Sequence, residues 1–140
     1  MVAKIQKWAR KKSPWVLPFN TGGCNGCDIE ILSLLTPHYD IERFGILKES
    51  SPRHADILLC TGPVTRQVQA RLQRIYDQMP SPKWVVAVGG CSCTGGVFTG
   101  GYNILGGIDK VLPVDMYIPG CPCRPEMIMD GLIQLIEGIE

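Results

Sequence analysis

Several protein classes are excluded by what the sequence lacks. No apolar run approaches the roughly 18 residues of a membrane-spanning helix, and the longest runs, such as Ile57–Cys60 and Trp84–Val88, have the length of β-strands. Neither Thr61–Thr65 nor the glycine-rich Gly89–Gly96 contains the lysine of a phosphate-binding loop. We therefore expect neither a membrane span nor a bound nucleotide or flavin.

Charged residues are also scarce, at 19% of 140, and their distribution is uneven. Residues 1–23 contain five lysines and arginines and no acid, whereas the remainder holds thirteen acids and nine basic residues. This pattern predicts a basic N-terminal arm, residues 1–19, that meets a partner or an anionic surface. The remainder, residues 20–140, is expected to form a single α/β domain. Nucleic acid is the alternative partner, but no nucleic-acid-binding motif accompanies the arm, so we expect none.

The seven cysteines are too few for a disulfide-dense miniprotein and too many for an ordinary intracellular domain. Their number is odd, and the apolar segment of a secretory signal does not follow the basic start, so we expect no export signal. A disulfide framework is therefore disfavoured. The cysteines are expected to be packing thiols or ligands of a metal or redox group.

Hydrophobic periodicity predicts alternating helices and strands. The two central runs are apolar throughout, which is typical of strands covered on both faces. The pattern therefore indicates a three-layer α/β fold with a mostly parallel sheet, in which ligands bind beyond the carboxyl ends of the strands. The expected helices are residues 1–12, 25–35, 64–79 and 125–138, and the expected strands are residues 41–47, 56–61, 84–89 and 114–119.

Three loops carry cysteines that can converge at this edge of the sheet. Cys24 and Cys27 form a C-x-x-C pair where a loop meets a helix, and Cys91 and Cys121 each follow a predicted strand. Four thiolates fit a [4Fe–4S] cluster or tetrahedral zinc, and a dithiol redox site is a further alternative. Ligands spread over about a hundred residues of a domain with its own core favour the cluster, because structural zinc usually binds on small loops.

The other three cysteines have different expected roles. Cys60 lies within a predicted buried strand and is expected to be a core thiol. Cys93 and Cys123 are each two residues from a proposed ligand, as neighbours or as alternative ligands. We favour Cys91 because it comes first after the strand and follows two glycines, and Cys121 because a helix begins just beyond it.

Four segments together carry a resemblance to a known family. They resemble the small electron-transfer subunit of membrane-bound, energy-converting [NiFe] hydrogenases of the group 4 type, which is homologous to the small iron–sulfur subunit of respiratory complex I. The resemblance implies a flavodoxin-like fold and one [4Fe–4S] cluster held by Cys24, Cys27, Cys91 and Cys121. Residues 20–140 are therefore expected to form a single iron–sulfur α/β domain. The segments are SPWVLPFNTGGCNGCDIEIL, HADILLCTGPVT, VGGCSCTGG and VDMYIPGCPCRPE.

The resemblance also implies a role in a larger assembly. Low-potential electrons would pass from a ferredoxin-like multi-cluster subunit through this proximal cluster to a Ni–Fe large subunit that evolves H₂. The arm would contact an integral membrane subunit of the ion-translocating complex, at the cytoplasmic face of the cell membrane. An equivalent subunit of a complex I-like or sulfur-reducing oxidoreductase is the alternative, and a zinc-stabilised interaction module is an alternative of a different class.

Details of the motifs refine this interpretation. Complex I counterparts have two adjacent cysteines where this chain has Cys24 and Cys27, so the spacing points to the hydrogenase branch. Cys123 replaces a proline of the family pattern. Glu30 is a candidate for a proton route at the subunit interface or an ordinary helix-start carboxylate, a role also expected of Asp28. Arg124 is a candidate to contact the cluster or partner, or to fix its loop, and His38 and His54 are expected at the surface.

Overall fold

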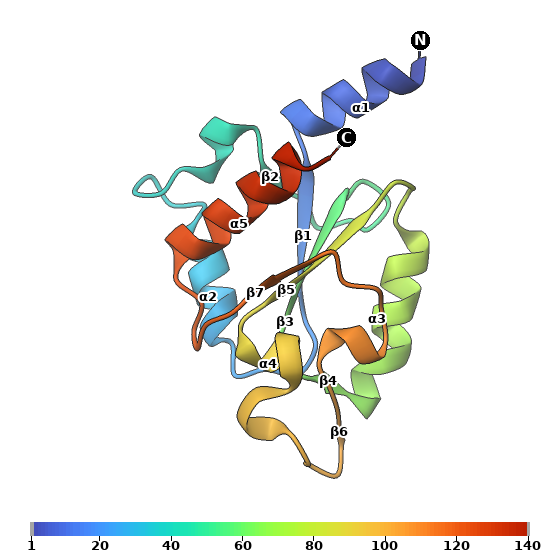
Figure 1. Ribbon diagram of the computed structural model, residues 1–140, viewed down its shortest axis with the longest axis vertical. Helices are drawn as coiled ribbons and strands as arrows, with labels where there is room; N and C mark the ends of the chain where they lie inside the picture. Colours follow the sequence, from blue (N-terminus) through green and yellow to red (C-terminus); the bar gives the residue numbers. More distant parts are fainter. Residues whose placement is uncertain (1, 140) are drawn as a thin grey trace.

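The computed structural model describes residues 2–139, so Met1 and Glu140, included in the expected arm and domain, lie outside the described residues. Helices and strands alternate along the chain (Figure 1). The elements are α1 (Val2–Lys12), β1 (Trp15–Asn20), α2 (Gly26–Ser33), β2 (Leu47–Lys48), β3 (Ile57–Thr61), β4 (Val64–Thr65), α3 (Arg66–Gln78), β5 (Trp84–Val88), α4 (Gly90–Thr94), β6 (Ile104–Gly106), β7 (Met116–Ile118) and α5 (Pro125–Glu137). Short 3-10 helices span Ile41–Phe44, Gly96–Phe98 and Ile108–Lys110.

Five strands form one parallel sheet in the order β2-β1-β3-β5-β7. This is the strand order of flavodoxin-like folds, in which the chain reverses its winding direction between the first strand and the third. A separate antiparallel pair joins β4 to β6. The predicted three-layer, mostly parallel α/β architecture is confirmed, and the sheet's carboxyl edge lies at the start of α2, at α4 and at the loop before α5.

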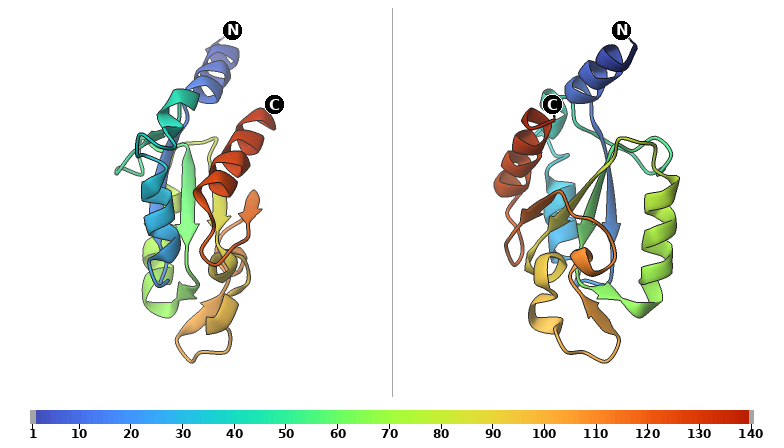
Figure 2. Two further views of the ribbon diagram at one scale, coloured as in Figure 1. Left: turned by 90° about the vertical axis from the view of Figure 1, so that its left-hand side faces the viewer. Right: turned by 45° about the vertical axis from the view of Figure 1, so that its right-hand side comes forward.

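Helices cover both faces of the sheet, as the turned views show (Figure 2). Consecutive side chains of β3 pack in two cores on opposite faces of the sheet. Ile57 and Leu59 pack with α2 and α5, whereas Leu58 and Cys60 pack with α3. Leu58 is fully buried, and such burial stabilises the fold by about 1.5–3 kcal/mol per large aliphatic side chain. These two cores hold the sheet rigid, so its carboxyl edge is a fixed platform for the loops.

The strand expected over residues 41–47 is wrong. Ile41 and Ile46 are buried as a strand would require, but the chain between them forms a 3-10 turn with positive φ at Asp40 (45°) and Gly45 (83°). A Cβ on Gly45 would lie 2.0 Å from the Lys12 carbonyl oxygen, so only glycine fits there. Pairing with β1 begins only at Leu47.

Strand β1 lies mostly within the expected arm and was not among the expected strands. Val16 and Leu17 are buried in the sheet. Pro18 is tolerated because β2 pairs only with the first part of β1. Strand β1 runs across the boundary at residue 19 that the sequence suggested.

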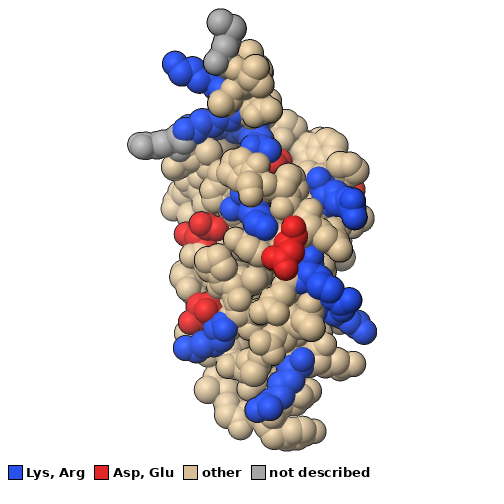
Figure 3. All heavy atoms as spheres, turned by 90° about the vertical axis from the view of Figure 1, so that its right-hand side faces the viewer, with Lys and Arg blue, Asp and Glu red and all other residues tan. Residues whose placement is uncertain are grey.

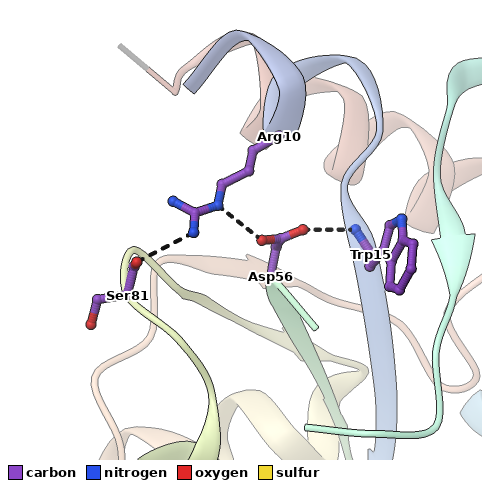
Figure 4. Close-up of polar contacts among 4 residues, drawn as sticks. All are labelled: Arg10, Trp15, Asp56 and Ser81. Atoms are coloured by element: carbon purple, nitrogen blue, oxygen red, sulfur yellow. Dashed lines mark hydrogen bonds and ion pairs between the residues drawn. The ribbon is translucent and has the colours of Figure 1, made fainter. Parts of the chain in front are cut away.

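Helix α1 projects from the amino edge of the sheet, opposite the cysteine loops (Figure 1). At its base, Arg10 Nε lies 3.2 Å from Asp56 Oδ1, and Arg10 also donates to the Ser81 carbonyl oxygen at 3.4 Å (Figure 4). Asp56 Oδ2 accepts from the Trp15 amide at 3.1 Å. The same carboxylate therefore anchors α1 and the start of β1. Among residues 2–139, no helix is both long enough and apolar enough to cross a bilayer.

Candidate metal centre

The C-x-x-C loop leaves the carboxyl end of β1 and enters α2. Asn25 adopts a left-handed conformation (φ 67°) just before the helix, a conformation that asparagine tolerates better than most residues. Cys24 is exposed in the loop, and Cys27 is half-buried in the first turn of α2. A small cleft beside them is also lined by Cys91. Two of the three expected cysteine loops therefore meet at the same place.

Cys91 lies in α4, directly after β5, where the backbone turns sharply. Gly89 has φ 91° and ψ 156°, a conformation essentially restricted to glycine. A Cβ at Gly89 would lie 2.5 Å from Cys27 Sγ, so the missing side chain makes room for that thiol. A Cβ at Gly96 would likewise lie 2.9 Å from Cys91 Sγ. The glycines thus form a cradle around two sulfur atoms.

The third loop follows β7 and carries Cys121. It is joined to the Cys91 loop by two backbone hydrogen bonds, from the Gly89 amide to the Ile118 carbonyl at 2.7 Å and from the Gly90 amide to the Gly120 carbonyl at 2.8 Å. On its other side, the Cβ position of Gly26 lies 3.5 Å from Cys24 Sγ and 3.6 Å from Pro122 Cβ. All three loops are therefore in mutual contact.

The electrostatics of these thiols reflect their proximity. Burial raises the pKa of Cys27, and the charges of Cys24 and Cys121 raise it further. Burial also raises the pKa of Cys91, with the other three thiols acting in the same direction. A hydrogen bond from the Cys123 backbone opposes the shift at Cys27. Cys24 and Cys121 therefore lie close enough to add to the effect of burial on the pKa values of Cys27 and Cys91, and bound cations would favour the thiolate forms of these two residues.

The donor set at this edge is four sulfurs framed by glycine backbone. Thiolate sulfur is the ligand that iron–sulfur clusters and zinc accept, so the chemistry of the donor atoms suits either group. Throughout residues 2–139, no three His, Cys, Asp or Glu side chains have the spacing that a single metal ion requires.

The remaining cysteines pack inward. Cys60 is fully buried in β3, which raises its pKa to about 12, and its expected role as a core thiol is confirmed. Cys123 is also inaccessible, and burial raises its pKa to about 11. It belongs to the α2–α5 core, whereas Cys93 packs against the α3 core. The two neighbours of the proposed ligands therefore lie on opposite sides of the sheet.

Glu30 and Arg124 both lie close enough to Tyr39 to act on it electrostatically. The Tyr39 hydroxyl donates to Glu126 Oε1 at 3.2 Å. Burial and the Glu126 carboxylate raise the pKa of Tyr39, with Glu30 adding to the shift and Arg124 opposing it. These residues thus share one electrostatic neighbourhood on the α2–α5 side. His38 and His54 are exposed, as expected.

Two polar residues beside the cysteines were missed by sequence reasoning. Asn20 and Thr61 are the last residues of β1 and β3 and are paired in register. Both donate hydrogen bonds to the Asp28 carboxylate. Their positions at the carboxyl ends of neighbouring strands, where the winding reverses, were the signal that could have found them.

The described elements have the fold of hydrogenase small subunits. The fold matches a chain of the [NiFeSe] hydrogenase from Desulfovibrio vulgaris Hildenborough, with a TM-score of 0.63 and 18% identity over 91% of this chain and 63% of that one. More particularly, the chain belongs to the family of the NADH ubiquinone oxidoreductase 20 kDa subunit, whose model matches residues 24–135.

Two further relatives are more similar in sequence. A Pyrococcus furiosus protein named "Probable membrane-bound hydrogenase subunit mbhJ" is 52% identical over 91% of this chain and 77% of its own length. A chain of the archaeal membrane-bound sulfane sulfur reductase has a TM-score of 0.85 and 45% identity, covering 97% of this chain and 75% of that chain. The resemblance inferred from the motifs is therefore confirmed.

Proposed function

We propose that this chain is the electron-transfer subunit of a membrane-bound [NiFe] hydrogenase, carrying its proximal [4Fe–4S] cluster. Cys24, Cys27, Cys91 and Cys121 are the proposed ligands. The chain would receive low-potential electrons from a ferredoxin-like multi-cluster subunit and deliver them to a Ni–Fe large subunit for H₂ evolution. It would not be catalytic alone.

One observation carries this proposal. Three loops, far apart in sequence, bring four cysteines to the carboxyl edge of one rigid sheet, with glycine at the points of closest approach to sulfur. When bound, a [4Fe–4S] cluster supplies one-electron transfer. The chain's own contribution is ligation, backbone hydrogen bonding toward sulfur and partial exclusion of water by the neighbouring loops.

Exposure of the outer cysteines suits a site completed by another subunit. Cys24 and Cys121 are exposed, and the apolar side chains of Ile29 in α2 and Val97 after α4 are 64% and 85% exposed. Exposed apolar surface of this kind marks interaction sites. We assign this edge to the Ni–Fe large subunit, because a relay needs its donor and acceptor close together.

The opposite edge is the proposed route to the membrane. Val2, Ile5 and Trp8 form an exposed apolar stripe on α1, and lysines and arginines flank it. Lys and Arg are more widespread than Asp and Glu over α1 and the α3 face (Figure 3). An amphipathic basic helix suits an integral membrane subunit near anionic headgroups. We place the chain peripherally, at the cytoplasmic face.

The sulfane sulfur reductase neighbour favours a second candidate function. At 45% identity and a TM-score of 0.85, that complex supports the same electron-transfer role with a sulfur compound as the final acceptor. The family model equally supports a complex I-like role with quinone. In each case this chain would do the same work, and the partner subunit would determine the reaction.

Metal analysis of the anaerobically purified full chain tests the cluster. We expect about four iron atoms and four acid-labile sulfides per chain. Cys27→Ser should lower the iron content by about ten-fold or more, whereas the matched change Cys60→Ala should leave it unchanged. One zinc per chain without sulfide would overturn the proposal in favour of a zinc-stabilised module.

A second experiment tests the acceptor. The complex recovered through a tag on this chain should contain a large subunit with two C-x-x-C pairs and should evolve H₂ from a reduced viologen dye. Reduction of polysulfide without H₂ evolution would replace the hydrogenase assignment by the sulfur-reducing one.

A further inference from the structure

Three polar side chains meet where β1 and β3 end, beside the C-x-x-C loop. Asn20 Nδ2 donates to Asp28 Oδ2, and Thr61 Oγ1 donates to Asp28 Oδ1. Each carboxylate oxygen is therefore held by the last residue of a different strand. Asp28 follows Cys27 directly in α2, so its carboxylate is fixed relative to the sheet and to that thiol.

Asn20 also holds the loop that carries Cys24. Its Oδ1 accepts from the amides of Gly22 at 2.7 Å and Gly23 at 2.9 Å. Its Nδ2 further contacts Asn25 Oδ1 at 2.9 Å. One side chain thus binds the backbone before Cys24, the residue after it and the carboxylate after Cys27.

We propose that Asn20, Thr61 and Asp28 form a clamp that positions Cys24 and Cys27 and fixes a negative charge beside the metal centre, lowering the cluster's reduction potential. This inference rests on the proposed cluster. None of the three residues is a ligand; they act through the loop and through charge. Hydrogen-bonded neighbours of metal ligands commonly tune affinity and potential in this way.

Charge gives the clamp its second effect. The Asp28 carboxylate follows Cys27 directly in the first turn of α2 and is held there by Asn20 and Thr61, so a negative charge stands next to that proposed ligand. Reduction adds one electron, and hence one negative charge, at this edge. A carboxylate held nearby opposes that added charge, and the Coulomb energy falls with distance. A fixed Asp28 therefore favours the oxidised form.

The simpler alternative is that Asp28 only complements the dipole of α2. A dipole role requires a charge in the first helical turn but no particular partner for it. Under that alternative, removing the Thr61 hydroxyl would change neither the cluster's retention nor its potential. The two interpretations therefore differ most clearly at Thr61.

A redox titration separates the two interpretations. The full chain is reconstituted anaerobically with iron and sulfide and then titrated with dithionite. Asp28→Asn should give a more positive midpoint potential and an altered EPR spectrum of the reduced state. Thr61→Val, which preserves shape in a buried position, should make loss of iron to a chelator about ten-fold faster. The matched controls Asp130→Asn on α5 and Thr36→Val after α2 should behave as wild type. An unchanged potential in Asp28→Asn together with an unchanged rate in Thr61→Val would overturn the clamp.

A measurement on the metal-free full chain tests the clamp independently of whether the chain binds a cluster. Asn20→Ala should accelerate amide hydrogen exchange at Gly22 and Gly23 by about ten-fold, because each loses its acceptor. Thr61→Val should give a smaller acceleration at the same amides. Unchanged exchange in both variants would refute the clamp, even if the chain binds iron. Zinc in place of iron would refute the proposed function, but the exchange rates would still decide whether the clamp positions the loop.

Discussion

The two edges of the sheet use aspartate in different ways. At the amino edge, Asp56 accepts from the Trp15 amide at 3.1 Å and pairs with Arg10, and Asp115 accepts from the Val85 amide at 2.7 Å. At the carboxyl edge, Asp28 is held by the neutral side chains of Asn20 and Thr61. At the amino edge, aspartate side chains accept hydrogen bonds from backbone amides of the strands. At the carboxyl edge, side chains of the strands donate hydrogen bonds to an aspartate of a helix.

This contrast separates stability from function. Arg10 compensates the charge of the nearly buried Asp56, and pairing of this kind offsets the cost of removing a carboxylate from water. Neutral donors hold Asp28 in place without supplying a positive charge. Changes at the amino edge should therefore alter stability and leave metal content intact, whereas changes at the carboxyl edge should alter metal content.

Gly89→Ala should give the largest effect. The backbone conformation at Gly89 costs a residue with a side chain about 1–3 kcal/mol, and the new Cβ would also collide with Cys27 Sγ. We expect a lower midpoint of thermal unfolding and a loss of most of the iron. Circular dichroism and iron analysis on the same preparation measure both effects.

Gly100→Ala is the matched control. Gly100 also has positive φ (86°), but no atom lies within 4 Å of its Cβ position. This variant should be only mildly destabilised and should retain its iron. If both variants lost iron equally, backbone strain rather than space for sulfur would explain the result.

Much of the fold could be predicted because the central strands leave little ambiguity. The residues of β3 and β5 are almost all inaccessible, and a strand covered on both faces reads as a continuous apolar run. Strand β1 was missed because Pro18 within it interrupts the same pattern. Residues 41–47 resemble a strand because they form an apolar run, with Ile41, Phe44, Ile46 and Leu47. Only Gly45 signals the turn, since a Cβ there would collide with Lys12.

The candidate site was predictable to a different degree. The four cysteines stand out by spacing and by their position after strands, which is local information. The clamp depends on Asn20 and Thr61 becoming neighbours through pairing of β1 with β3. Such pairing is non-local, and each residue alone resembles an ordinary strand terminus. The sequence suggested only a helix-start role for Asp28 because Thr61 is 33 residues away along the chain and Asn20, eight residues before it, lies on the other side of the Cys24 loop.

Arg10→Met tests the amino edge. Removing the guanidinium leaves Asp56 nearly buried without its cation, while the aliphatic packing of the side chain is kept. Because the Arg10 side chain is 25% exposed and that of Asp56 is 12% exposed, we expect a cost of about 1–2 kcal/mol, below the cost for a fully buried pair. Denaturant unfolding measures it. Lys7→Met, one turn earlier on α1, should cost almost nothing, and iron content should be normal in both variants; iron loss in Arg10→Met would contradict the separation of the two edges.

The smallest effect is expected at Glu49, which follows strand β2. Its carboxylate accepts from backbone amides, as Asp56 and Asp115 do, but it remains accessible to solvent. Its Oε1 accepts from the amides of Ser50 at 2.8 Å and Ser51 at 3.2 Å, and these two bonds lower the Glu49 pKa from its usual 4.5. Because the folded-state pKa is depressed, the contribution to stability is present above the ordinary glutamate pKa and is lost as the pH falls through the lowered value. NMR titration should therefore show the Ser50 and Ser51 amide shifts changing together with a midpoint below 4.5, and Glu49→Gln should abolish that change. A midpoint above the ordinary value would mean that the carboxylate does not hold these amides in solution.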